Sequence, residues 1–109
     1  MTAIESQQKR VIVFFDLPTT DKSERKAAAG FRKDLIGNGF LMMQYSVYSR
    51  YCSSDAVVQT HIMRLRRYVP AKGSVRVLVI TENQYQKMEI LVGEMSKNEK
   101  KTAEQLSFF

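Results

Sequence analysis

A run of five apolar residues, Val11–Phe15, leads directly into Asp16, and Pro18 follows two residues later. The β-branched and aromatic side chains of this run favour a strand that is buried on both faces. Pro18 has no backbone N–H and restricts the residue before it, so we predict a strand over residues 10–16 that ends in a turn. With 109 residues, the chain is long enough for one domain with one modest core.

Two helices are predicted from apolar periodicity. Asp21 and Glu24 have the spacing of a capping box, and the helix that they begin is expected to end near Gly37. A second helix is predicted to begin at residues 53–55 and to end before Pro70. Each helix has one apolar stripe that can face the core. The stripes are Ala28, Phe31 and Leu35 on the first helix, and Val58, Ile62, Leu65 and Val69 on the second.

Strand-like patterns fill the rest of the domain. Residues 40–51 alternate in polarity but are too many for one strand, so we predict two strands with a tight turn or bulge near residues 44–46. Ser74–Thr81 is a further apolar strand. Glu82–Gln86 is interpreted as a short polar turn, and Met88–Val92 as a fifth strand.

The predicted order of elements is that of an α+β ferredoxin-like βαββαβ sandwich with an extra C-terminal strand. In this fold two helices cover one face of an antiparallel sheet. Because the first strand is apolar on both faces, we expect a second copy of the chain to cover the other face, which makes a homodimer. The alternative to a homodimer is that this sheet face is small and is partly covered by the tail of the same chain. The domain is predicted to span residues 1–93, followed by a polar tail, residues 94–109.

Positive charge is concentrated in the middle of the chain. The net charge is +6, and residues 21–76 carry 11 Lys and Arg against 4 Asp and Glu. This pattern indicates a polyanionic partner, such as nucleic acid or an anionic membrane, and the alternative is a solvated basic surface. Cations on the outer helix faces and in the segment after them are predicted to contact the phosphates of a duplex. They are Arg25, Arg32, Lys33, Arg64, Arg67, Lys72 and Arg76.

Membrane and secretory features are absent from the sequence. Five consecutive apolar residues are too few for a membrane-spanning helix, and no basic segment precedes an apolar stretch near the N-terminus. The single cysteine, Cys52, cannot form an internal disulfide, which suits a reducing compartment. We therefore expect a cytoplasmic protein.

Asp16 is the main candidate for chemistry. A carboxylate that ends a buried strand is costly unless it is paired or binds a metal, so Asp16 is a candidate magnesium ligand for phosphodiester chemistry. The alternative is a turn-capping Asp that accepts hydrogen bonds from the amides after Pro18. One carboxylate is a weak metal site unless a two-fold axis brings a second Asp16 beside the first. His61 is the only histidine, which excludes a two-histidine site within one chain, and it is expected to be partly exposed.

Four segments resemble the CRISPR-associated protein two family, the small dimeric proteins of CRISPR adaptation. They are Val11–Pro18, Asn38–Phe40, Gln44–Tyr48 and Lys72–Leu78, and the resemblance covers roughly residues 10–93. The chain is most similar to the versions from Cas9-type (type II) systems. The resemblance implies a ferredoxin-like homodimer in which the fifth strand adds to the partner's sheet. It also implies one magnesium ion (Mg2+) per dimer, between the two Asp16 side chains.

Two functions of different kinds are implied by this resemblance. The first is a non-catalytic scaffold for spacer acquisition in antiviral defence, in which the dimer bridges duplex DNA and partners the CRISPR integrase. The second is a magnesium-dependent endoribonuclease or endonuclease that cleaves RNA or DNA with the Asp16 pair. One carboxylate per subunit without an obvious general base favours the scaffold. A metabolite-binding domain of the same fold is a third interpretation, which the basic helix faces disfavour.

The tail ends in apolar residues, although residues 94–105 are polar. Leu106, Phe108 and Phe109 are expected to dock on the integrase, with the alternation of Leu106 and Phe108 suited to a sheet edge. The alternative is that these residues fold back onto their own dimer.

Overall fold

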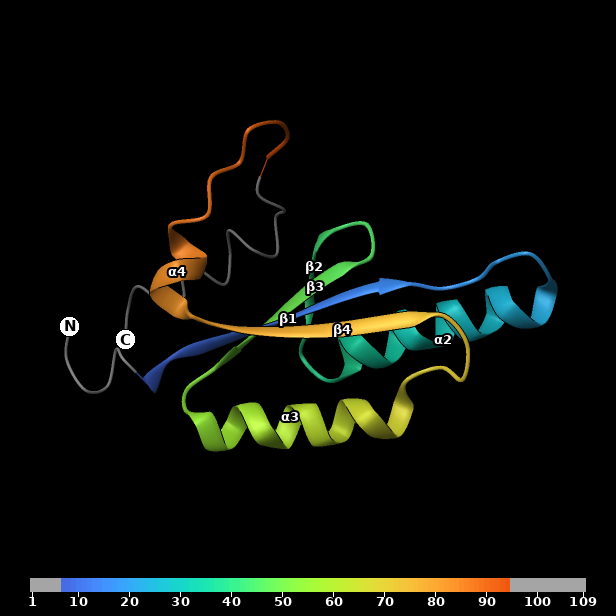
Figure 1. Cartoon of the computed structure of the whole chain (residues 1–109), viewed down its shortest axis with the longest axis horizontal. Helices are drawn as coiled ribbons and strands as arrows, with labels where there is room; N and C mark the ends of the chain where they lie inside the picture. The colour runs from blue at the N-terminus through green and yellow to red at the C-terminus, as the bar shows by residue number, and fades with distance from the viewer. Residues whose placement is uncertain (1–6, 95–109) are drawn as a thin grey trace.

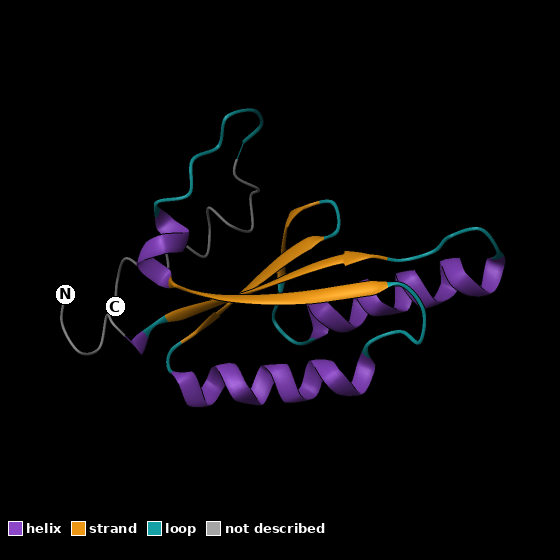
Figure 2. Cartoon of the chain, in the orientation of Figure 1, coloured by secondary structure: helices purple, strands orange, loops and turns teal. Residues whose placement is uncertain are grey.

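The structure is a computed structural model in which residues 7–94 are described (Figure 1). One four-stranded antiparallel sheet, in the order β2-β3-β1-β4, carries the two long helices on one face (Figure 2). This is the predicted ferredoxin-like arrangement. The strands are β1 (Lys9–Asp16), β2 (Leu41–Gln44), β3 (Val47–Cys52) and β4 (Ser74–Thr81). The helices are α2 (Lys22–Gly37), α3 (Asp55–Tyr68) and α4 (Glu82–Gln86).

The core lies between the sheet and the two long helices. Val11, Val13 and Phe15 share one face of β1 because side chains alternate along a strand, and they pack against buried residues of α2 and α3. The Phe15 ring meets Phe31 of α2 edge-on, with ring centroids 5.1 Å apart. On the opposite face Phe14 is 40% exposed, so β1 is not buried along its whole length on both faces.

The predicted ends of the two long helices are confirmed. The Asp21 carboxylate accepts a hydrogen bond from the Glu24 N–H at 2.7 Å, and the Glu24 carboxylate accepts one from the Asp21 N–H at 3.3 Å. Ser54 caps α3 by accepting from the Val57 N–H. Of the predicted stripe on α3, Val69 lies beyond the end of the helix and is exposed.

The two-strand interpretation of residues 40–51 is also confirmed. β2 pairs with β3, and their register shifts between Met42 and Gln44, which is the predicted irregularity. Ser46 has a φ of +65° in the turn between the strands.

Two predictions about the segment after β4 are wrong. Residues 82–86 form the short helix α4 and not a polar turn, because Thr81 and Gln84 make a reciprocal capping box, with bonds of 3.0 and 2.9 Å. Met88–Val92 is not a strand in this chain. α4 directs the segment away from the sheet (Figure 1), and a strand forms only where another strand supplies hydrogen-bond partners.

A buried ion pair fixes α4 to the sheet. Arg10 of β1 donates to both carboxylate oxygens of Glu82, at 2.9 and 2.5 Å, and its guanidinium lies 3.9 Å from the centroid of the Tyr85 ring. The Arg10 and Glu82 side chains are both buried. This pair could not be predicted from the sequence, because 72 positions separate its members and neither belongs to a recognisable motif.

The tail prediction, with Leu106, Phe108 and Phe109, lies outside the described residues. Among the residues described, no helix has the length and apolar character needed to span a bilayer.

Candidate functional site

Asp16 lies at the end of β1, where Ser74 of β4 is its partner in the sheet. Its side chain is exposed, so the desolvation cost that was predicted for this carboxylate is not present. Over residues 7–94 the carboxylate accepts no hydrogen bond, and the turn-capping alternative is therefore not what the structure contains. Asp16 is available to an external ligand.

Gly73 holds the end of β1 in place from the other side. It has a φ of +95°, in the left-handed region that favours glycine. A Cβ at this position would lie 2.7 Å from the Asp16 carbonyl oxygen and 2.9 Å from the Leu17 side chain. The loop before β4 can therefore pack on the Asp16–Leu17 backbone only with glycine here. Gly73 lies in one of the segments that resemble the family, but no local pattern in the sequence indicates this positioning role.

The described part of one chain does not group enough ligands for a metal site. Within the described part of the chain, no three His, Cys, Asp or Glu side chains are grouped closely enough to hold a metal ion. An exposed carboxylate oxygen suits magnesium, but it is a single ligand where a site normally needs several. Asp16 alone therefore does not make a magnesium site, and an ion held there would need further ligands from outside the described part of this chain.

The predicted phosphate contacts fall into two groups. Arg25, Arg32 and Lys33 of α2 and Arg64 and Arg67 of α3 belong to the helix layer, and all but the half-buried Arg32 are exposed. Lys72 and Arg76 form the second group, in the loop before β4 and on β4 itself.

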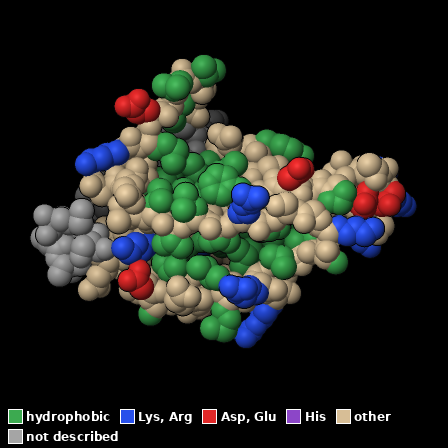
Figure 3. All heavy atoms as spheres, viewed as in Figure 1, with side chains coloured by type: hydrophobic (Ala, Val, Ile, Leu, Met, Phe, Trp, Pro, Cys, Tyr) green, Lys and Arg blue, Asp and Glu red, His purple; other side chains and the backbone are tan. Residues whose placement is uncertain are grey.

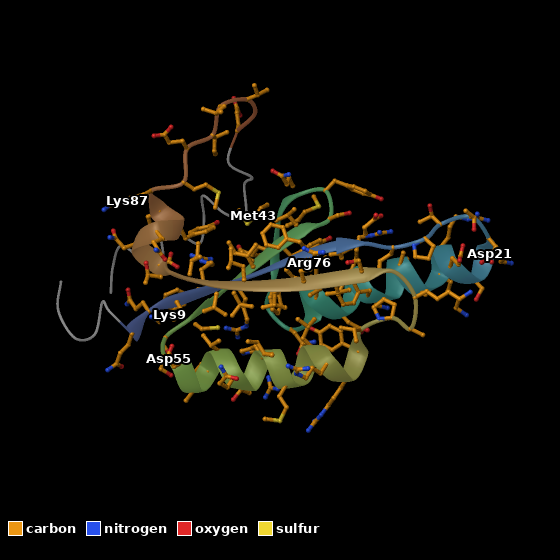
Figure 4. All side chains as sticks on the ribbon, viewed as in Figure 1. Lys9, Asp21, Met43, Asp55, Arg76 and Lys87 are labelled. Carbon is orange, nitrogen blue, oxygen red and sulfur yellow. The ribbon has the colours of Figure 1, made fainter. Side chains whose placement is uncertain are left out.

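The position of Arg76 separates the second group from the first. Arg76 pairs with Phe14, which places it on the sheet face opposite the helices, and Figure 4 labels it on β4. The structure therefore does not bring all seven cations to one surface. Figure 3 likewise shows Lys and Arg side chains distributed over this view, with hydrophobic side chains exposed around β4.

The cations of these two groups are free to bind an anion. Among residues 7–94 the single ion pair within 4.0 Å joins Arg10 and Glu82, so none of the seven is neutralised at that distance. Lys72 is the least free, because it lies near Glu24. A hydrogen bond from the Thr20 hydroxyl is the main cause that lowers the pKa of Glu24, and the charge of Lys72 contributes further.

His61 differs from its predicted exposure. Its side chain is buried on α3, with its ring edge-on to Phe40. Burial lowers its pKa, and the nearby positive charges of Arg50 and Arg64 lower it further. The ring therefore belongs to the inward face of α3, where it packs against Phe40. Cys52 is buried as a small core residue.

The fold and the site define a small α+β domain with one exposed carboxylate at the end of its central strand and a cationic helix layer. Residues 9–88 match the family model described as CRISPR associated protein Cas2. The chain belongs to this family.

Relatives and a solved structure agree with the family model. A protein of Parvibaculum lavamentivorans named CRISPR-associated endoribonuclease Cas2 is 48% identical over 91% of this chain and 98% of its own length. A relative of the same name from Acidovorax ebreus is 44% identical over 92% of this chain and 99% of its own. A structure titled "Crystal structure of cas2" superposes with a TM-score of 0.56 at 23% identity, covering 83% of this chain and 92% of that one, and so supports the fold.

Proposed function

We propose that this chain is a scaffold subunit of CRISPR adaptation: a homodimer that holds duplex DNA through its phosphates and partners the CRISPR integrase. The observation that carries the proposal is that the seven predicted cations form no ion pair among residues 7–94 of a Cas2 fold. Arginine predominates among them, and a guanidinium can bind a phosphate through two parallel hydrogen bonds. Such contacts depend on charge and shape and not on base sequence. That the system is of the Cas9 type stays a prediction.

Exposed apolar surface supports the homodimer. Phe14 and Leu78 are exposed on the sheet face that the long helices leave open, and Ile90, Leu91 and Val92 are exposed after α4. Apolar surface of this extent favours association in water. A second copy would cover it and would also bring a second Asp16 into the assembly.

A duplex-binding measurement tests the scaffold. We expect the wild-type protein to bind blunt DNA duplexes of unrelated sequence with equal affinity, and the affinity to fall steeply with salt. Replacing Arg64 and Arg67 with Ala should weaken binding to every sequence and reduce the slope of log K against log salt by about 1.8. Gln59→Ala, also exposed on α3, is the matched control and should bind as the wild type does. A marked preference for one sequence, or binding that does not respond to salt, would contradict the proposal.

A second candidate is a magnesium-dependent endoribonuclease, which is favoured by the names of the relatives and by the exposure of Asp16. Asp16 from each of two chains would hold the ion, and Gly73 would keep each carboxylate at its strand end. Magnesium, when bound, would offset the negative charge of the phosphate under attack. Nuclease assays on the wild type and Asp16→Asn, purified in parallel, test this candidate. Equal cleavage by the two proteins would contradict it.

A further inference from the structure

We propose that Asp16 pairs with Arg76 of a second copy of the chain, so that the open face of the sheet is an interface whose charges complete one another. The inference rests on the homodimer of the proposed function and deepens it, because it names the side chains that determine how the two copies meet. It also gives Asp16 a part in the assembly that a non-catalytic scaffold can use.

Asp16 and Arg76 project from the same face of the sheet, the one that the long helices leave open. Side chains alternate along β1, so Phe14 and Asp16 point away from the face that carries the core residue Phe15. In the register of β1 with β4, Phe14 lies opposite Arg76. Two residues further along β1, Asp16 lies opposite Ser74. Arg76 is therefore a diagonal neighbour of Asp16, a position at which Cα atoms are typically about 7–8 Å apart.

These two residues carry the free charges of the open strand face. The register places three charged strand residues on this face, and the third, Arg10, is already paired with Glu82. Asp16 and Arg76 are both exposed, and among residues 7–94 neither has an ion-pair partner within 4.0 Å. Each is thus free to take a partner from another molecule.

A molecule that covers the apolar part of this face must also cover the two charges. Phe14 is 40% exposed and Leu78 is 51% exposed. Each lies two residues from one of the charged residues, on the same face of its own strand. Covering them removes water from the charges, and an ion that has lost its water is costly unless an opposite charge meets it. A second copy is favoured as the occupant because it brings one charge of each sign.

Two-fold symmetry makes this face complementary to itself. In a two-fold interface residue i of one copy contacts residue j of the other, and j contacts i. An axis that passes between Asp16 and Arg76 therefore forms two ion pairs, one on each side. An axis that brings like charges together would instead cost free energy. Because Asp16→Asn keeps an oxygen that can accept from the guanidinium, reversal of the charge is the sharper test.

Charge reversal in two separately tagged copies of the full chain tests the inference. Asp16→Arg leaves a copy with two cations at the site, and Arg76→Asp leaves one with two carboxylates. Each variant alone should have a dimer dissociation constant roughly 10-fold or more above that of the wild type, because like charges meet. In an equal mixture the two variants should form heterodimers in excess of random exchange, since both contacts then join opposite charges. Native mass spectrometry measures the proportions.

The control mixture replaces Arg76→Asp with Lys26→Asp, a reversal at an exposed position of α2. No preference for heterodimers is expected there, because α2 lies on the other side of the sheet. A double variant with Asp16→Arg and Arg76→Asp in one chain should dimerise as the wild type does, which also shows that the fold tolerates both changes.

The mixture distinguishes contact between copies from contact within one chain. A pair that formed only within a chain would give random exchange in the mixture, and that result overturns the inference while the homodimer stands. A double variant that remains monomeric also overturns it. A monomeric wild type refutes the homodimer of the proposed function and the inference together.

Discussion

At the scale of single residues, the Arg10–Glu82 pair is a buried ion pair that joins β1 to α4. Both side chains are buried, and each carboxylate oxygen accepts a hydrogen bond from the guanidinium. Glu82 also accepts from the Gln86 side chain at 2.8 Å, and Tyr85 lies against the guanidinium. A charge in this position is stable only while its partner remains.

Glu82→Met should therefore destabilise the fold more than the loss of both charges does. We expect the single substitution to cost about 3–5 kcal/mol of unfolding free energy, because Arg10 stays buried without a partner. The double variant Arg10→Met with Glu82→Met should recover much of that loss. Urea unfolding of the two variants measures the difference, with Asn83→Ala as an exposed control. A double variant less stable than the single one would contradict this account.

At the scale of elements, the long helices and the four strands follow from local signals. The capping box of Asp21 and Glu24 and the alternation of polarity are physical causes that act over a few residues, so a sequence displays them. α4 has a capping box as well, at Thr81 and Gln84, but five residues are too few to show apolar periodicity. The fifth strand could not be decided from local signals, because a strand depends on a partner.

The exposed segment after α4 is predicted to join two copies of the chain. Leu91 is 88% exposed and Val92 is 95% exposed, so replacing both with Ser removes no packing within the described chain. We expect this double variant to remain folded. At micromolar concentration it should sediment as a smaller species than the wild type. Met63→Ser, on the outer side of α3, is the control for lost apolar surface. A wild type that is already monomeric would refute the homodimer.

At the scale of the whole molecule, the candidate site is assembled by topology. Asp16 was found from sequence because it ends an apolar run, whereas the role of Gly73 depends on which strand lies beside β1. The cations were predicted residue by residue, but their division between the helix layer and β4 follows from the sheet order. The spacing of residues along one helix cannot indicate which cations of other elements lie on the same surface.

Spacer integration by Asp16→Asn, assayed with the integrase and a duplex substrate, is the most direct test of the scaffold. The substitution keeps the size of the side chain and removes the only carboxylate at the end of β1, while every cation stays in place. The scaffold account predicts integration close to that of the wild type, with any magnesium-dependent cleavage abolished. Loss of integration by a variant that still forms dimers and binds duplex DNA would contradict the account and would assign the protein a catalytic role.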